Sequence, residues 1–254
     1  MREILIKIVR LFLALLRIRF SRPMDKGITF FGVNMSLVGS YPVANKKGRG
    51  VAGIDELIRR SPVSMVDLGA GSNVHALKVL SKLDCEVVTV DYGTSVYSRN
   101  SVQLPPSIKS YFCDIYEFES PHLFEAVWAS HVLEHQLNSE RFIRKCLSLC
   151  APDGFIYITL PTWHRAMLGG HLSIWSPGLL AYNVVLCGID LSDANLLYGD
   201  DEFTLIFSPR SISLPSDLTY DSGDLSKLAN YLPSWVYEGA DMWPKMNFQS
   251  GSGF

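Results

Sequence analysis

The sequence lacks the patterns that mark several common classes of protein. It has five cysteines among 254 residues and no Cys-x-x-Cys pair, which excludes a zinc ribbon and a thioredoxin-like site. It has no basic excess, since 23 Lys and Arg against 25 Asp and Glu give a net charge of −2, and a dedicated nucleic-acid binder would be basic. It has no apolar run near the roughly 20 residues of a transmembrane helix. We therefore expect one large domain, or one domain with appendages.

Charged residues are also scarce, at 19 %, while hydrophobic residues reach 48 %. This balance favours a large buried sheet, a partner or a membrane surface. The scattered cysteines lie mostly in apolar stretches, which indicates reduced, buried thiols and a cytoplasmic location. They are Cys85, Cys113, Cys146, Cys150 and Cys187.

Residues 1–20 predict an amphipathic helix. Glu3, Lys7, Arg10, Ala14 and Arg17 fall on one narrow face at about 100° per residue, and apolar residues cover most of the remainder. A basic stripe beside a broad apolar face is typical of a helix in the interface of an anionic membrane. The alternative is a helix packed on the domain or on a second subunit. On the first interpretation the protein is peripheral at the cytoplasmic face of a membrane.

From residue 54 the sequence alternates between short apolar runs and amphipathic segments. Strands are expected at 63–68, 86–90, 110–113, 126–129 and 155–160, with helices at 54–60, 76–83 and 141–149. A turn at Pro152-Asp153-Gly154 precedes the fifth strand. This alternation predicts a doubly wound, mostly parallel α/β sheet.

The remaining segments set the predicted domain boundaries. An amphipathic helix covers 1–22 and a lead-in or cap segment 23–53; the sheet domain covers 54–207, with an insertion at 161–195, and an irregular extension covers 208–254. Within the insertion, Ser176 is expected to cap a helix that starts at Pro177 and ends at Gly188. A terminal antiparallel hairpin is expected from 196–198 and 203–207.

The strongest motif follows the first predicted strand of the domain. Asp67-Leu-Gly-Ala-Gly71 places an acid and two glycines where open α/β sheets let a ligand approach the backbone. Val74 stands where a dinucleotide-binding loop would need a third glycine. Asp91 ends the next strand and is placed to accept hydrogen bonds from ribose hydroxyls, and Asp114 follows the third and could reach an adenine amino group.

With these motifs, the sequence resembles the class I S-adenosylmethionine-dependent methyltransferases over residues 54–160, and the hairpin matches their last two strands. Residues 124–135 resemble the motif of their fourth strand, whose end lines the methyl-transfer site. The resemblance implies a Rossmann-like, seven-stranded sheet with the last strand antiparallel. It also implies a set of cofactor-binding residues: Asp67, Gly69, Ala70, Gly71, Asp91, Tyr92, Asp114, Ile115 and Ser130.

The segment His131-Val-Leu-Glu134-His135 also matches the His-x-x-Glu-His pattern of inverted zinc peptidases. That reading is disfavoured, because the segment follows a buried strand and no further carboxylate ligand is evident. The segment is similar to the Glu-x-x-Glu-His that holds a divalent metal in the methyltransferases of ubiquinone biosynthesis. His131 replaces the first Glu, which weakens a magnesium site. We expect no metal here; a metal, if bound, would be held by His131, Glu134 and His135.

The resemblance predicts methyl transfer from S-adenosylmethionine to a small-molecule, glycan or lipid-linked acceptor. For a hydroxyl acceptor a base is needed, and His131 and His135 are the first candidates because imidazole titrates near neutral pH. His164 and His171, in the insertion, come next. The alternative function is a non-catalytic methyltransferase-fold scaffold in a membrane or protein complex. An NAD-dependent reductase is disfavoured by Val74 and by the lack of a Tyr-x-x-x-Lys pair.

Overall fold

The computed structural model describes residues 19–20, 28–30, 33–35, 49–100, 102–162, 169–199, 201–221 and 223–236. The chain divides into two compact units, one formed by residues 1–41 and 238–254 and the other by residues 42–237. In the first unit, β1 (Arg19–Phe20), β2 (Ile28–Phe30) and β3 (Val33–Met35) form an antiparallel sheet. The amphipathic helix predicted for 1–22 lies outside the described residues except at 19–20, which are a strand.

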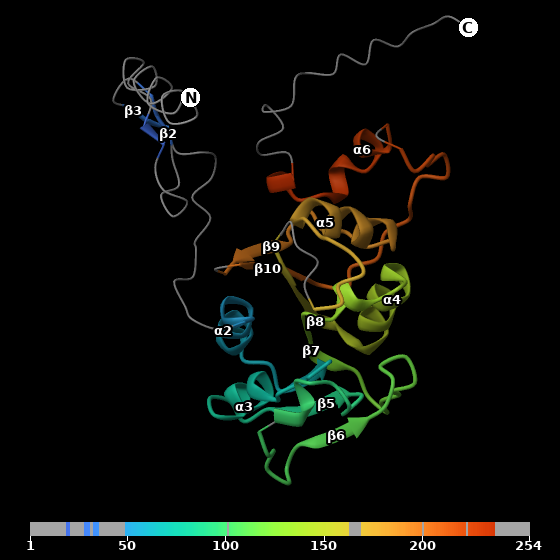
Figure 1. Ribbon diagram of the computed structural model, residues 1–254. Coiled ribbons are helices and arrows are strands. Elements are labelled where there is room, and N and C mark those ends of the chain that lie inside the picture. The colour runs from blue at the N-terminus through green and yellow to red at the C-terminus, as the bar shows by residue number, and fades with distance from the viewer. Residues whose placement is uncertain are drawn as a thin grey trace, which may run out of the picture. The chain divides into compact units, whose positions relative to one another are not determined.

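The second unit is built on a seven-stranded sheet (Figure 1). In spatial order the strands are β6 (Lys109–Phe112), β5 (Glu86–Asp91), β4 (Ser64–Leu68), β7 (Phe124–Ser130), β8 (Cys150–Pro161), β10 (Glu202–Phe207) and β9 (Asn195–Tyr198). The first five are mutually parallel, whereas β10 is antiparallel to both β8 and β9. This confirms the predicted mostly parallel sheet with its last strand antiparallel.

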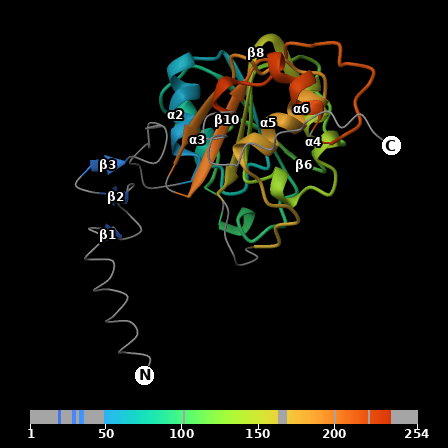
Figure 2. The ribbon, with the colours of Figure 1, turned by 90° about the horizontal axis from the view of Figure 1, so that it is seen from above.

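Helices cover both faces of this sheet (Figures 1 and 2). Apolar residues of α2 (Val51–Arg60) and α3 (Val74–Leu80) join one core cluster with alternate strand residues such as Met65 and Val87. Apolar residues of α4 (Ser139–Leu149) and α5 (Pro177–Leu186) join the other, with Val66 and Val88. Because successive strand side chains point to opposite faces, each strand contributes to both cores.

The predicted caps of α5 are confirmed, and the predicted turn before the fifth strand is wrong. Ser176 caps α5 by accepting a hydrogen bond from the Leu179 N–H at 3.1 Å, and Gly188 follows the helix end with a φ of 85°. The predicted turn at 152–154 does not separate two elements, because these residues form a bulge within β8. The register there shifts so that Phe124 pairs with Cys150 while Ala126 pairs with Phe155.

The described residues of the C-terminal extension belong to the second unit. It contains α6 (Asp224–Lys227) and the short 3-10 helices η3 (Ala229–Tyr231) and η4 (Ser234–Val236). Leu228 and Leu232 are buried in the same core cluster as α4 and α5. Two more 3-10 turns, η1 (Ser98–Asn100) and η2 (Leu133–His135), follow β5 and β7. Within the described part of the chain, no helix is long and apolar enough to cross a membrane.

Candidate active site

The order of the sheet decides where a ligand can bind. β4 pairs with β5 on one side and with β7 on the other. The chain adds β5 and β6 on one side of β4 and then crosses to the other side to add β7, so the strand order reverses between β4 and β7. In open α/β sheets, the carboxyl ends of the strands at such a reversal form the ligand crevice. The glycine loop after β4, Asp91 at the end of β5 and Ser130 at the end of β7 therefore meet at one edge.

The glycine loop adopts a backbone conformation that residues with a side chain rarely adopt. Gly69 and Gly71 have φ angles of 73° and 51°, in the left-handed region that glycine tolerates best. The Gly69 N–H donates to the Val90 carbonyl oxygen at 2.7 Å, which ties the loop to β5. A Cβ atom on Gly69 would lie 2.5 Å from Cγ2 of Val132. The loop thus brings bare backbone to the edge where a ligand would lie, with Ala70 buried between the glycines.

Asp91 organises the loops around it. Its Oδ2 accepts a hydrogen bond from the Gly71 N–H at 3.0 Å, and its Oδ1 accepts from the Gly93 N–H at 2.7 Å. The Ser98 hydroxyl donates to Oδ1 at 2.6 Å. The carboxylate therefore fixes the position of the glycine loop relative to the turn after β5.

Asp67 is a buried carboxyl group with an orphaned oxygen. Asp67 is 1 % exposed, and its Oδ2 has no hydrogen-bond partner among the described residues. Burial, aided by the nearby charge of Asp91, raises the pKa of Asp67 to about 8. Such a group favours a cationic ligand, which would supply the missing partner.

The side chains after β5 and β6 form a more exposed part of the site. Tyr92 is 61 % exposed, and its hydrogen bond to Asp114 raises the pKa of its hydroxyl. Asp114 Oδ1 accepts the Tyr116 N–H at 2.9 Å, while the adjacent Ile115 is buried in the core. This arrangement offers an aromatic face and a carboxylate to a planar, amino-bearing group.

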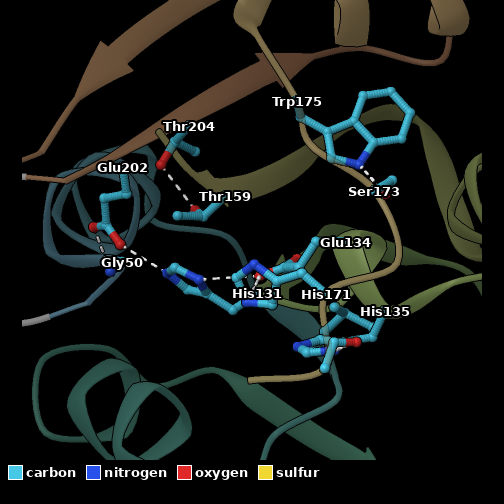
Figure 3. Close-up of polar contacts among 12 residues, drawn as sticks. Gly50, His131, Glu134, His135, Thr159, His171, Ser173, Trp175, Glu202 and Thr204 are labelled. Atoms are coloured by element: carbon cyan, nitrogen blue, oxygen red, sulfur yellow. Dashed lines mark hydrogen bonds and ion pairs between the residues drawn. The ribbon is translucent and has the colours of Figure 1, made fainter. Parts of the chain in front are cut away.

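The segment after β7 holds a histidine between two carboxylates (Figure 3). His131 has a φ of 57°, and its Nδ1 and Nε2 lie 3.2 Å from Glu134 Oε1 and 2.9 Å from Glu202 Oε2. Burial disfavours the charged imidazole, but the two carboxylates outweigh it and raise the pKa of His131 to about 9. The premise that His131 titrates near neutral pH is therefore wrong, and both ring nitrogens are engaged.

Glu202 is the site residue that the sequence analysis missed. Its Oε1 accepts the Gly50 N–H at 2.5 Å, so it links His131 to the segment that opens α2. It comes to this edge because β10 is antiparallel to β8, with Glu202 opposite Pro161 at the carboxyl end of β8. The usable signal was an acid directly before the strand expected at 203–207 to run antiparallel, and the structure starts that strand at Glu202.

His75, which the sequence analysis also missed, fixes the same segment at the start of α2. The Trp128 indole N–H donates to His75 Nδ1 at 3.2 Å, so the proton is on Nε2, which lies 2.8 Å from the Arg49 carbonyl oxygen. Burial lowers the pKa of His75 and favours this neutral form. The lead-in expected to cap a site is thus bonded at two successive residues, Arg49 and Gly50.

Glu134, His135 and His171 lie together beside His131. His171 Nε2 is 3.9 Å from Glu134 Oε1, and the rings of His171 and His135 have centroids 5.0 Å apart. Each of the three offers one ligand atom, and these atoms lie within 4.8 Å of one another. His164 lies outside the described residues. The structure therefore joins His135 and His171 in one cluster.

The metal set implied by the ubiquinone-type resemblance does not fit. It would use positions 131, 134 and 135, but His131 Nδ1 and Nε2 are both occupied by Glu134 and Glu202. The cofactor set fits better. Asp67 Oδ2 and Ser130 Oγ are both buried without a hydrogen-bond partner among the described residues, and both residues lie near the carboxyl ends of their strands.

The fold and this edge define a class I methyltransferase-type α/β protein. The family model for the methyltransferase domain matches residues 44–192, more than half of the chain, and the chain belongs to that family. The resemblance seen in Asp67 to Gly71 is therefore confirmed at family level. No curated protein sequence matches the chain.

Many solved structures have a similar fold, including the following two. One is Burkholderia thailandensis 1,6-didemethyltoxoflavin-N1-methyltransferase with bound 1,6-didemethyltoxoflavin and S-adenosylhomocysteine, at 16 % identity and a TM-score of 0.50 over 65 % of this chain and 78 % of that chain. The other is human N-acetylserotonin methyltransferase in complex with SAM, at 14 % identity and a TM-score of 0.51 over 64 % of this chain and 53 % of that chain. At these identities the similarity concerns the fold.

Proposed function

We propose that the protein binds S-adenosylmethionine and transfers its methyl group to a hydroxyl of a small-molecule, glycan or lipid-linked acceptor. The observation that carries the proposal is the row of acids at one edge of the sheet: Asp67, Asp91 and Asp114 lie at or just beyond the carboxyl ends of three adjacent strands, beside a glycine loop. The similar structures with bound S-adenosylhomocysteine or SAM support it. We also propose a cytoplasmic location, peripheral at the cytoplasmic face of a membrane, on the basis of the basic stripe and broad apolar face of residues 1–20.

Each part of the cofactor has a matching group in the chain. The carboxylate of Asp91 suits the two ribose hydroxyls, and the bare backbone of Gly69 to Gly71 permits close approach of the cofactor. Asp114 and Tyr92 suit the adenine amino group and ring. The buried carboxyl of Asp67 suits the ammonium of the methionine part, because an adjacent cation stabilises the ionised carboxylate.

The chemistry assigned to the chain is positioning. The cofactor would supply a methyl group on a sulfonium, from which a neutral thioether leaves when the S–CH3 bond breaks. The chain must hold the acceptor atom in line with that methyl group and exclude water, and such alignment can contribute several kcal/mol. Ser130 and the residues after it, at the end of β7, are placed to form the boundary between cofactor and acceptor.

The acceptor side of the proposed site is the cluster of Glu134, His135 and His171. Burial lowers the pKa of His171, so its imidazole is neutral at neutral pH and can accept a hydrogen bond from a hydroxyl group. His131 is less suited to that task, because both its ring nitrogens bind carboxylates. The segment that carries His171 is fixed to Glu134, whose carbonyl oxygen accepts the Leu172 N–H at 2.8 Å.

The test is calorimetric titration of S-adenosylhomocysteine into the wild type and Asp91→Ala. We expect wild-type binding in the micromolar range and a loss of at least tenfold in the variant, about 1.4 kcal/mol or more. Because Asp91 also holds the loops, Asp91→Asn serves as a second variant that keeps its size. The control is Asp153→Asn, an exposed acid in the bulge of β8, away from the cofactor loops.

The result of this titration distinguishes the enzyme from the non-catalytic scaffold. If the folded wild type does not bind S-adenosylhomocysteine, the enzyme proposal is overturned and the non-catalytic scaffold takes its place. If it binds, an acceptor screen with the methyl-labelled cofactor follows, with soluble hydroxyl compounds in one arm and lipid-linked glycans in the other. Turnover of soluble metabolites alone would count against a lipid-linked acceptor.

A further inference from the structure

Glu134, His135 and His171 form a cluster with the composition of a metal site (Figure 3). One ligand atom from each lies within 4.8 Å of the others, and the two imidazole rings meet at 83°. A bound ion about 2.1 Å from each atom would require separations of at most about 4.2 Å. Both histidines are partly exposed, so small changes of their side-chain torsions can close the remaining distance.

Glu134 provides an independent reason to expect a cation. The residue is 0 % exposed, and although Oε1 contacts His131, Oε2 has no hydrogen-bond partner among the described residues. A buried carboxylate oxygen without a partner is costly, and this cost falls when a cation coordinates it. The unpartnered oxygen belongs to the carboxylate whose other oxygen, Oε1, lies 3.9 Å from His171 Nε2.

The local backbone also prepares the cluster. The Leu172 and Ser173 N–H groups donate to the Glu134 carbonyl oxygen at 2.8 and 3.3 Å, which holds the segment after His171 against η2. His135 Nδ1 lies 3.2 Å from the Gly170 carbonyl oxygen. If Nδ1–H donates to that oxygen, Nε2 is left as the free ligand atom, as is usual for a metal-binding histidine.

We propose that Glu134, His135 and His171 bind one divalent transition-metal ion at the acceptor side of the site. Two imidazoles and one carboxylate favour Zn²⁺, Co²⁺, Mn²⁺ or Fe²⁺ over Mg²⁺, which prefers oxygen ligands. His171, from the segment before α5, takes the place that position 131 would have in the ubiquinone-type set. His131, which is held by Glu202, then orients Glu134 without binding the ion, as hydrogen-bonded groups around the ligands do in metal sites.

This inference deepens the proposed function, on which its catalytic meaning rests. The ion would contact the acceptor hydroxyl, so His135 and His171 would act on the acceptor through the ion and not directly. Metal binding itself does not depend on the cofactor. It can therefore be measured in the free protein, without turnover.

The experiment is titration of the full-length, chelator-treated protein with Co²⁺, followed by visible absorption, and with Zn²⁺ in competition. We expect one equivalent to bind. His171→Gln and Glu134→Gln should weaken binding at least about tenfold, since even second-layer changes commonly cost about 10–100-fold. The matched control is His122→Gln, because His122 Nε2 also pairs with a glutamate, Glu86, at 3.3 Å, but near the amino ends of the strands.

Each outcome decides the inference. No stoichiometric binding by the wild type, or unchanged affinity in His171→Gln, overturns it; selective loss in the two cluster variants supports it. Titration with S-adenosylhomocysteine is run on the same samples. Cofactor binding without metal binding sinks the metal site alone, whereas metal binding without cofactor binding sinks the proposed function alone. Retained cofactor binding in Glu134→Gln also shows that the variant is folded.

Discussion

The imidazole of His131 lies 2.9 Å from the Glu202 carboxylate, although 71 residues separate them in the chain. The same carboxylate binds the backbone of Gly50, 152 residues away. One buried acid thus connects the turn after β7, the antiparallel strand β10 and the segment that opens α2. Through these two contacts, Glu202 joins the segment before α2 to the proposed acceptor side.

We predict that Glu202→Gln lowers the free energy of unfolding by about 1–3 kcal/mol, because it leaves a buried cationic imidazole with one carboxylate instead of two. Denaturant unfolding monitored by tryptophan fluorescence measures it. The control is Glu86→Gln, which disrupts the more exposed pair with His122 and should cost less than about 1 kcal/mol. Equal effects of the two substitutions would contradict a special role for Glu202.

Gly69→Ala should destabilise the protein by about 1–3 kcal/mol and weaken S-adenosylhomocysteine binding. The new methyl group would lie 2.5 Å from Val132 Cγ2, on a backbone whose φ is 73°. Gly170→Ala is the matched control, since Gly170 has a φ of 77° but nothing within 4 Å of an added Cβ. The difference in unfolding free energy between the two variants isolates the steric clash. If they behave alike, backbone strain alone explains both.

Asp67→Asn should change how stability depends on pH. The pKa of Asp67 is raised from 3.8 to about 8 in the folded protein, so between those values the folded state holds a proton that the unfolded state has released. Stability attributable to this group therefore falls as pH rises from about 4 to 8, by at most about 1.4 kcal/mol per unit. The substitution removes the decline, so the variant should gain stability relative to the wild type between pH 5 and pH 8.

The same variant should bind S-adenosylhomocysteine more weakly, because it cannot ionise to pair with the ammonium group. Thermal unfolding and calorimetry at pH 5 and pH 8 check the two effects on one preparation. Asp153→Asn, an exposed carboxylate, reports any general effect of losing one acid. A stability difference between Asp67→Asn and wild type that does not change with pH would contradict the raised pKa.

Removal of residues 1–20 should abolish co-flotation with vesicles that contain anionic lipid. The basic stripe and broad apolar face of this sequence favour interfacial binding, to which each Lys or Arg adds about 1 kcal/mol near an anionic surface. A flotation assay with anionic and neutral vesicles measures the effect. Unchanged flotation of the truncated protein would exclude this segment as the anchor, and absence of flotation by the full chain would exclude the membrane location.

Local chemistry made much of the second unit predictable. The alternating apolar runs placed the strands, since each pattern reflects the period of a buried strand or an amphipathic helix. The turn at Gly69 to Gly71 and the acid at Asp91 followed from short motifs whose function depends on neighbours in the chain. Ser176 and Gly188 were readable as helix caps because capping needs only a few adjacent residues.

Only the tertiary structure decided which distant groups share the site. Glu202 reaches His131 because β10 enters the sheet antiparallel beside β8, and His171 reaches Glu134 because a loop after β8 is bonded to the turn after β7. No local periodicity encodes such pairings, which depend on the order of strands. For the same reason the pKa of His131 could not be read from its residue type: burial and two remote carboxylates determine it together.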